Sequence, residues 1–327
     1  MLPIAVDAMG GDKGPGEIVA GARQAASELG VPVLLVGDPD TIGDAGGLDV
    51  LATTEVIGMG EDAATAIRLK KDASVVRAAE TVREGRASAM VSAGNTGAAM
   101  GSALLRMGRL RGVSRPAIAT PIPVPGSTPT VLLDAGANAE CQAAWLVQFA
   151  QMGAAYFTGR YGVEAPRVGL LSIGEEPSKG SPLVKEAHRL LASGDSAGLD
   201  GHFVGNVEGG DLMSDRVDVV VTDGFTGNIA LKALEGAASF MRDAVFGVLM
   251  STDEAIKASE VLLPLLAPLA TELDSDTYGG ALLLGVDGVC IISHGSSSAS
   301  AVVNAVGVAR DMVQDGLVER LRQAVKA

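Results

Sequence analysis

The chain has 327 residues, with 43 glycines and only 3% aromatic residues, so it can bury a substantial core of aliphatic side chains. Its 25 lysines and arginines against 39 aspartates and glutamates give a formal net charge of −14, which argues against broad nucleic-acid binding. The two cysteines, Cys141 and Cys290, are too few and too far apart for a disulfide framework or a zinc site, and we expect buried thiols.

The chain enters an apolar, strand-like run at residues 2–6, without the charged region and cleavage site of a secretory leader. No run reaches the ~18–20 apolar residues that a membrane-spanning helix needs. We therefore expect a cytoplasmic protein.

Apolar runs typical of strands alternate with helical stretches along the whole chain. We expect strands at residues 4–7, 32–37, 87–91, 117–122, 130–134, 168–173, 203–207, 217–222 and 289–292. We expect helices at residues 16–29, 60–84, 96–108, 138–157, 180–193, 226–250 and 297–325. The alternation predicts a three-layer α/β fold with a mostly parallel sheet. No low-complexity linker divides residues 1–327, so a single domain, with two lobes around a cleft as an open alternative, is expected.

Three glycine-bracketed polar turns each follow a predicted strand and open into a predicted helix. They are residues 92–97 (SAGNTG), 223–228 (DGFTGN) and 293–297 (SHGSS). A strand, a glycine turn and a helix present unpaired backbone N–H groups to an anion. Because ligands collect at the carboxyl ends of parallel strands, we expect the turns to share one edge of the sheet and to form a phosphate-binding cleft. Helix capping by Asn95 or Thr96 is the alternative interpretation.

The turn at residues 7–12 (DAMGGD) has the same form. Gly10 and Gly11 would permit close approach of the backbone to a ligand, and Asp7 ends a strand. Asp12 either lines the cleft or caps the following helix. The turn that contains Asn138 (LDAGAN) repeats the arrangement at a later strand end.

Residues 174–180 (GEEPSKG) supply Lys179, and Lys185 lies on the helix that follows. An ammonium group beside a glycine turn is a strong point charge for phosphate, although a solvated surface position is the favoured interpretation for each lysine taken alone. His294 follows a buried strand, where it would bind an oxyanion, donate a proton or simply cap a helix. The absence of GxSxG, HExxH and GxGxxG motifs argues against common hydrolases, zinc enzymes and dinucleotide dehydrogenases.

Two further segments concern partners. Basic residues crowd residues 68–86 and 106–115, and each stretch is either a solvated helix face or a patch for an acidic partner. Residues 255–270 are apolar and contain Pro264 and Pro268, which would kink the helix or split it into a helical hairpin. Dimerisation, contact with a membrane surface and burial in the core all stay open for this segment.

Eight motifs occur in an order that resembles the bacterial phosphate acyltransferases. They are VDAMGGD, VSAGNTGA, LLDAGAN, GEEPSKG, GNVEGGD, VDVVVTDGFTGN, YGGALLLG and SHGSSS, and they cover essentially the whole chain. The resemblance implies a fold like those of phosphotransacetylases and isopropylmalate dehydrogenases. It also implies transfer of a fatty acyl group from acyl-carrier protein to inorganic phosphate, giving acyl phosphate for phospholipid synthesis and for a downstream glycerol-phosphate acyltransferase. A homodimer, sometimes peripheral on the membrane, is implied as well.

From this resemblance we expect no cofactor and no metal, because phosphate is itself a nucleophile. We also expect no nucleic-acid partner. The catalytic residues are expected to be His294, Lys179 and Asn228. The substrate and phosphate site is expected at Asp7, Gly10, Gly11, Asp12, Asn95, Thr96, Gly97, Asn138, Ser178, Lys185, Asp223, Gly224, Gly295 and Ser296. The docking site for the acidic carrier is expected at Arg68, Lys70, Lys71 and Arg77. Gly210 and Ser298 stand where some relatives have Arg and Asp, and neither is assigned a role.

Three other functions stay open. A phosphotransacetylase would use acyl-coenzyme A with the same chemistry. A β-decarboxylating dehydrogenase would need a metal and a nicotinamide site, and a non-catalytic scaffold would use residues 255–270 as a membrane contact.

Overall fold

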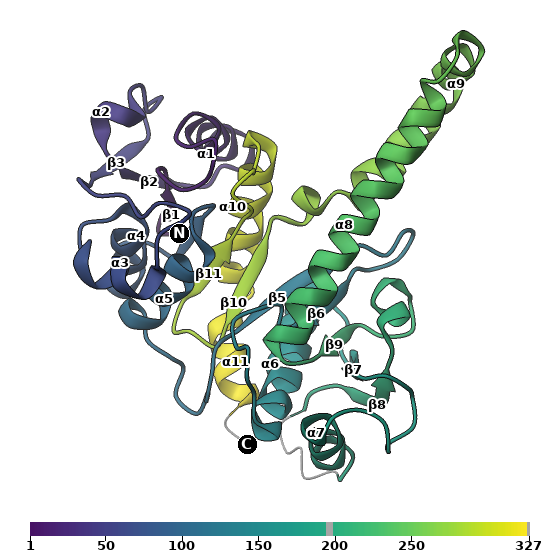
Figure 1. Cartoon of the computed structure of the whole chain (residues 1–327). Coiled ribbons are helices and arrows are strands. Elements are labelled where there is room, and N and C mark those ends of the chain that lie inside the picture. Colours follow the sequence, from purple (N-terminus) through teal and green to yellow (C-terminus); the bar gives the residue numbers. More distant parts are fainter. Residues whose placement is uncertain (194–198, 326–327) are drawn as a thin grey trace.

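The computed structural model describes residues 1–193 and 199–325, and its strands form one eleven-stranded mixed sheet (Figure 1). The strand order is β3-β2-β1-β4-β11-β10-β5-β6-β9-β7-β8. Successive residues of β1 enter different cores, with Ile4 and Val6 in one and Ala5 in the other. Helices therefore cover both faces of the sheet, and the predicted three-layer α/β fold is confirmed.

The first half of the sheet is entirely parallel. It consists of β1 (Ile4–Asp7), β2 (Val33–Gly37), β3 (Asp49–Ala52), β4 (Ala89–Ser92) and β11 (Val289–Ile292). Its helices are α1 (Gly16–Leu29), α2 (Pro39–Ile42), α3 (Ala63–Leu69), α4 (Ser74–Arg83), α5 (Thr96–Arg106) and α10 (Ala299–Gln314). Helix α1, from the first part of the chain, packs here against α10, from its last part (Figure 1).

The chain direction changes in the middle of the sheet. β10 (Ala281–Leu284) is antiparallel to both β11 and β5 (Ala117–Ile122), and β5 is antiparallel to β6 (Thr130–Leu133). The second half continues parallel to β6 through β9 (Val219–Val221), β7 (Arg167–Leu171) and β8 (His202–Val207). The strands of the second half therefore run opposite to β1, β4 and β11. The helices of this half are α6 (Ala143–Tyr161), α7 (Pro182–Ala192) and α11 (Leu317–Ala324), with short 3₁₀ turns at Gly209–Met213 and Ser275–Tyr278.

Several boundaries differ from the sequence prediction for local reasons. The expected helix 60–84 is two helices, because Ala73 is extended and begins α4 anew. The expected helix 297–325 ends at Asp315 and restarts after Gly316, whose φ of 71° is left-handed. Strands β3 and β10 were not expected; β3 is a partly exposed edge strand and lacks the apolar run that marked the predicted strands.

A long helical hairpin projects from the sheet, formed by α8 (Gly224–Leu249) and α9 (Asp253–Leu273) (Figure 1). Residues 255–270 lie within α9, so the expectation that they form a hairpin of their own is wrong. Pro264 and Pro268 sit inside a continuous helix. Both are exposed, so the carbonyl groups that lose an N–H partner can bind water instead. Among the described helices, none combines the length and apolarity that crossing a bilayer demands.

Candidate functional site

The carboxyl ends of β1, β4 and β11 bring three of the predicted turns together. We call residues 7–12, 92–97 and 293–297 the first elbow cluster. Ser92 Oγ donates a hydrogen bond to Asp7 Oδ2 at 2.7 Å, and the Asp12 amide donates to the Gly295 carbonyl at 2.7 Å. A Cβ at Gly10 would lie 2.6 Å from the amide nitrogen of the facing Gly94. Glycine is therefore required at Gly10, because the two turns are in direct backbone contact.

The first elbow cluster leaves several backbone amides unused. Asn95 caps α5, where its Oδ1 accepts from the Ala98 amide at 3.0 Å and its Nδ2 donates to the Met59 carbonyl at 2.9 Å. Within residues 1–193 and 199–325, no acceptor is assigned to the amides at Thr96 and Gly97 or at Gly295 and Ser296. Asn95 is therefore a helix cap, as the alternative interpretation held. The unpaired amides of Thr96 and Gly97 are the first two amides of α5. Four unpaired donors at one helix start and one glycine turn suit an anion.

Asp7 is buried within this cluster, and burial raises the pKa of its carboxyl group. The carboxyl group accepts hydrogen bonds from Ser92 and, at 3.3 Å, from the Met9 amide. A raised pKa favours the protonated form, which does not repel an anion bound nearby.

Neither cysteine is poised as a nucleophile. Burial raises the pKa of the Cys141 thiol to about 11 and that of the Cys290 thiol to about 12. Only the thiolate attacks carbonyl carbon, so both groups are unreactive near neutral pH. The expectation of buried thiols is confirmed for Cys290, whereas Cys141 is only partly buried.

The carboxyl ends of β6 and β9 form a second elbow cluster, which we define as residues 134–138 and 223–228. Asp134 Oδ2 accepts from the amide and the side chain of Asn138, at 2.7 and 2.9 Å. The Asn138 carbonyl then accepts from the Gly224 amide at 2.8 Å. Asp223 Oδ1 accepts from the Thr226 amide at 2.8 Å. At the start of α8, the amides of Gly224 and Thr226 are therefore already hydrogen-bonded within the protein. Asn228 is exposed and lies beside Gly136.

The expectation that all polar turns share one edge of the sheet is wrong. The first cluster follows β1, β4 and β11, whereas the second follows strands that run in the opposite direction. Three successive antiparallel pairings, β11–β10, β10–β5 and β5–β6, cause this difference, because an odd number of reversals leaves β6 running opposite to β11. The carboxyl ends of antiparallel strands lie at opposite edges.

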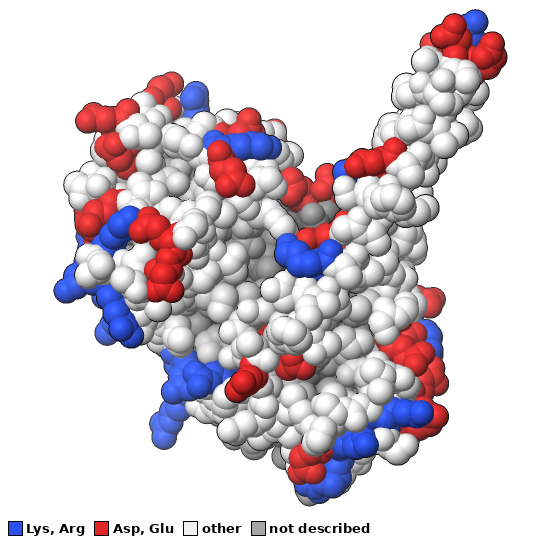
Figure 2. Space-filling model, in the orientation of Figure 1, with Lys and Arg blue, Asp and Glu red and all other residues white. Residues whose placement is uncertain are grey.

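Helix α8 links the two clusters. His294 Nε2 lies 3.3 Å from Glu235 Oε1, and Lys232 Nζ lies 2.8 Å from Glu235 Oε2. Glu235 follows Asn228 by seven residues, or roughly 10 Å along a helix. Figure 2 shows a hollow between the base of the hairpin and the part of the molecule formed by α1 and α10, with charged side chains at its border. A substrate that extends along α8 would meet both clusters.

The loop with Ser178 and Lys179 lies at the carboxyl end of β7, beside β9 and thus on the side of the second cluster. Asn206 holds this loop, because its Nδ2 donates to the Glu176 carbonyl at 2.9 Å while its Oδ1 lies 3.0 Å from His188 Nδ1. Ser178, Lys179 and Lys185 are exposed, so their assigned roles stay predictions that concern the second cluster.

The expected docking residues differ in their availability. Lys70 binds Glu61 at 2.6 Å, and Arg77 binds Glu80 at 2.7 Å. Arg68 and Lys71 are exposed, and within the described chain no hydrogen bond or close ion pair is assigned to either. Only these two of the four charges are free for an acidic partner.

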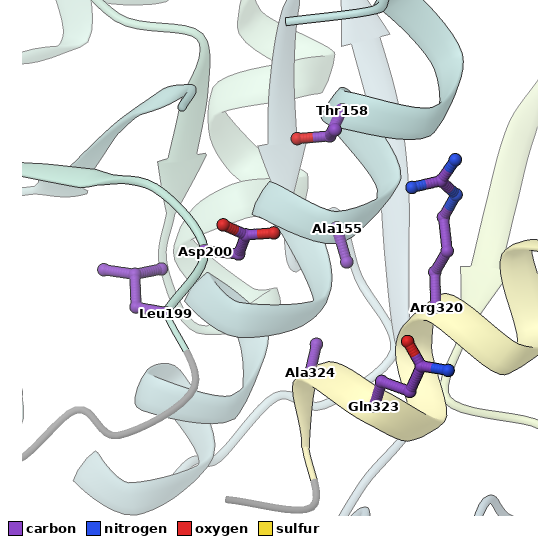
Figure 3. Close-up of a pocket in the computed structure, with 7 residues that line it drawn as sticks. All are labelled: Ala155, Thr158, Leu199, Asp200, Arg320, Gln323 and Ala324. Atoms are coloured by element: carbon purple, nitrogen blue, oxygen red, sulfur yellow. The ribbon is translucent and has the colours of Figure 1, made fainter. Parts of the chain in front are cut away.

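A cavity of about 370 Å³ lies elsewhere, between α6, α11 and residues 199–200 (Figure 3). Its lining residues are Ala155, Thr158, Leu199, Asp200, Arg320, Gln323 and Ala324. None of them belongs to an elbow cluster, so this cavity is not the candidate site. In the described residues, no group of three or more His, Cys, Asp or Glu side chains is arranged to hold a metal ion.

Comparison with known proteins decides the family. A family model described as fatty acid synthesis protein matches residues 2–320. The phosphate acyltransferase of Heliobacterium modesticaldum is 47% identical over 334 residues, which cover 99% of this chain and 98% of that protein. The phosphate acyltransferase of Elusimicrobium minutum is also 47% identical, over 99% of this chain and 96% of that protein. The chain belongs to the phosphate acyltransferase family.

Solved structures place this phosphate acyltransferase family member in a wider fold. A phosphotransacetylase from Streptococcus pyogenes matches with a TM-score of 0.63 at 17% identity, over 96% of this chain and 94% of that one. The EutD phosphotransacetylase from Staphylococcus aureus matches with a TM-score of 0.61 at 16% identity, over 95% and 94%. A 4-hydroxythreonine-4-phosphate dehydrogenase from Klebsiella pneumoniae gives 0.56 at 15% identity, over 96% and 100%. At such identities the likeness shows the fold alone.

The site of this family member also contains residues to which the sequence analysis gave no role. Ser293 and Ser297 carry buried hydroxyl groups without a hydrogen-bond partner among the described residues. The serine-rich turn after β11 was a usable signal for both. Glu235 and Asp134 contact predicted site residues, but Glu235 lies in mid-helix, where no local motif marks it.

Proposed function

We propose that this protein transfers a fatty acyl group from acyl-carrier protein to inorganic phosphate, giving acyl phosphate for phospholipid synthesis. Membership of the phosphate acyltransferase family supports acyl transfer to phosphate. The observation that carries the assignment to a site is the set of unused amides in the first elbow cluster. Those of Gly295 and Ser296 lie on the turn that also holds His294, and those of Thr96 and Gly97 lie at the start of α5. We propose that these amides bind phosphate without a cofactor.

The chemistry needs few protein groups. A phosphate oxygen attacks the thioester carbonyl carbon, and the tetrahedral intermediate expels the thiol of the carrier. The amides hold the phosphate in position, which is the main contribution to such a reaction. His294 stabilises the oxyanion or protonates the departing sulfur. A side-chain nucleophile is unnecessary, in line with the raised pKa values of both thiols.

The test is phosphate-dependent release of free carrier thiol from a long-chain acyl-carrier protein, with hydroxylamine trapping of the acyl phosphate. Because hydroxylamine also cleaves thioesters, it is added only after the remaining acyl-carrier protein has been removed. The proposal predicts that free thiol and acyl hydroxamate then appear together, and only when phosphate was present. Release of thiol without acyl hydroxamate would indicate a thioesterase and overturn the proposal.

His294→Ala tests the assigned chemistry. We expect kcat to fall about 100- to 1,000-fold with little change in KM, because general acid catalysis and oxyanion stabilisation act in the transition state. Steady-state kinetics against carrier and phosphate measure both constants. His202→Ala is the matched control, since His202 is exposed at the start of β8. An unchanged kcat would remove His294 from the mechanism.

A donor based on coenzyme A is the second candidate, favoured by the fold shared with phosphotransacetylases. The same assay with short acyl-coenzyme A separates the two. A higher kcat/KM for acyl-coenzyme A than for acyl-carrier protein would select the second candidate.

We also propose a homodimer formed through the hairpin. Apolar side chains are exposed along its shaft, with Val261 70% and Leu265 73% accessible. Its tip instead carries Asp253, Glu254 and Lys257, and Figure 2 shows these charged groups gathered at the end of the hairpin. A charged tip with an apolar shaft favours a second copy along the shaft over insertion of the tip into a membrane. Peripheral membrane contact, as a route to the downstream glycerol-phosphate acyltransferase, is the alternative that liposome sedimentation would reveal.

A further inference from the structure

The carboxylate of Glu235 lies between His294, a residue of the first elbow cluster, and Lys232. Its Oε1 is 3.3 Å from His294 Nε2, and its Oε2 is 2.8 Å from Lys232 Nζ. The contact joins α8 to the turn after β11, two elements that are 59 residues apart in the chain. The carboxylate is partly shielded, with 31% of its side chain accessible, while His294 is 48% accessible.

We infer that Glu235 is a positioning residue for His294 and that Nδ1 is the nitrogen of His294 that faces the reacting atoms; this inference rests on the proposed function. An imidazole ring has two nitrogens, and the partner of one fixes the orientation and protonation of the other. Because Nε2 of His294 is hydrogen-bonded to Glu235, Nδ1 is the ring nitrogen that is available to contact a substrate. Lys232 holds the second carboxylate oxygen and thereby fixes the plane of the carboxylate.

The resulting step balances. A phosphate oxygen forms a bond to the thioester carbon, and as the intermediate collapses the carbon–sulfur bond breaks, with its electron pair going to sulfur. Nδ1–H of the imidazolium gives its proton to that sulfur. The neutral ring that remains keeps Nε2–H directed at Glu235.

The electrostatics of Glu235 agree with this arrangement. The hydrogen bond from His294 is the largest cause that lowers the pKa of Glu235, and Lys232 lowers it further. The carboxylate is thus ionised when it faces the ring. Glu235 also lies two helical turns beyond Asn228, on the side of α8 that reaches the first elbow cluster.

The experiment compares Glu235→Gln with wild type in the acyl-carrier-protein assay, alone and combined with His294→Ala. We expect Glu235→Gln to lower kcat about 10- to 100-fold, as loss of an orienting partner does, with KM for phosphate nearly unchanged. In the His294→Ala background the same change should have no further effect, because Glu235 acts through the ring. Asp243→Asn, an exposed carboxylate on the same helix, is the matched control and should keep wild-type kcat.

A second readout uses the leaving group. With an aryl thioester, whose thiolate leaves without a proton, the loss caused by Glu235→Gln should shrink to a few-fold. An equal loss with both thioesters, or independent losses in the double variant, would overturn the inference. Lys232→Gln is a milder second variant, and we expect it to lower kcat a few-fold. Thermal melting of each variant identifies any that fails to fold.

Failure of the inference differs from failure of the proposed function. If wild type forms no acyl phosphate, the proposed function is wrong. If the wild-type enzyme is active but Glu235→Gln has the same kcat as the control variant Asp243→Asn, only the role assigned to Glu235 is wrong.

Discussion

We propose that backbone amides, rather than side chains, are the main binding groups of the first elbow cluster. The side chains around them have supporting tasks: Asn95 caps α5 and Ser92 binds Asp7. A binding surface of amides is neutral and fixed in place, so it holds an anion without a permanent positive charge. This suits a protein whose net charge is −14 and whose proposed acyl donor is an acidic carrier protein.

Asp7 makes a pH-dependent contribution to stability. Burial raises its pKa above the ordinary value of 3.8, so the unfolded chain releases this proton at a lower pH than the folded protein. The stability that Asp7 contributes is thus highest below about pH 4 and falls as the pH rises through the folded-state pKa, by about 1.4 kcal/mol for each unit between the two pKa values.

Asp7→Asn should remove this dependence. The fall in the free energy of unfolding between about pH 4 and about pH 7 should be smaller in the variant than in wild type. Urea unfolding followed by circular dichroism at both pH values measures it, with Asp243→Asn as an exposed control. An identical fall in wild type and Asp7→Asn would contradict the buried, raised pKa.

At the scale of elements, α8 has three tasks. Its start completes the second elbow cluster, its middle presents Glu235 to His294, and its outer part pairs with α9 in the hairpin. The exposed apolar side chains of α9 recur at spacings of three and four residues, as at Val261 and Leu265, which is one helix face.

The proposed dimer predicts that Val261→Asp combined with Leu265→Asp weakens self-association at least 100-fold. Each fully buried aliphatic side chain contributes about 1.5–3 kcal/mol, and 1.4 kcal/mol is tenfold in affinity. Light scattering after size-exclusion chromatography over a dilution series measures the change. Leu69→Asp is the matched control, because Leu69 is 75% exposed on α3 outside the hairpin. Unchanged association in the double variant would exclude the shaft as the interface.

The local elements of the fold were largely predictable, but their arrangement was not. Residues 4–7, 117–122 and 289–292 were predicted as the strands that the structure contains, because apolar runs bounded by turn residues carry that signal. The polar turns were predicted too. The edge of the sheet at which each turn lies was not, because it depends on the three antiparallel pairings β11–β10, β10–β5 and β5–β6. Long-range pairing is absent from local sequence patterns. The same holds for Glu235, whose role depends on a contact 59 residues away.

At the scale of the whole molecule, the uneven distribution of charge bears on where the proposed acidic carrier protein docks. Arg68 and Lys71 are free on one side, whereas Lys70 and Arg77 are bound to carboxylates. We expect Arg68→Glu with Lys71→Glu to raise KM for acyl-carrier protein about tenfold at low salt and less at high salt, with kcat unchanged. Arg242→Glu with Lys257→Glu makes the same change in net charge on the hairpin and is the control. Equal effects of the two pairs would show that only net charge matters.

The central claim is that inorganic phosphate binds the unused amides of the first elbow cluster beside His294. Crystallography with arsenate, a phosphate analogue that anomalous scattering locates, tests it most directly. The account predicts one anion within about 2.7–3.2 Å of the amide nitrogens of Thr96, Gly97, Gly295 and Ser296. An anion found only at the start of α8 or beside Lys179, with the first cluster empty at a concentration that saturates activity, would contradict it.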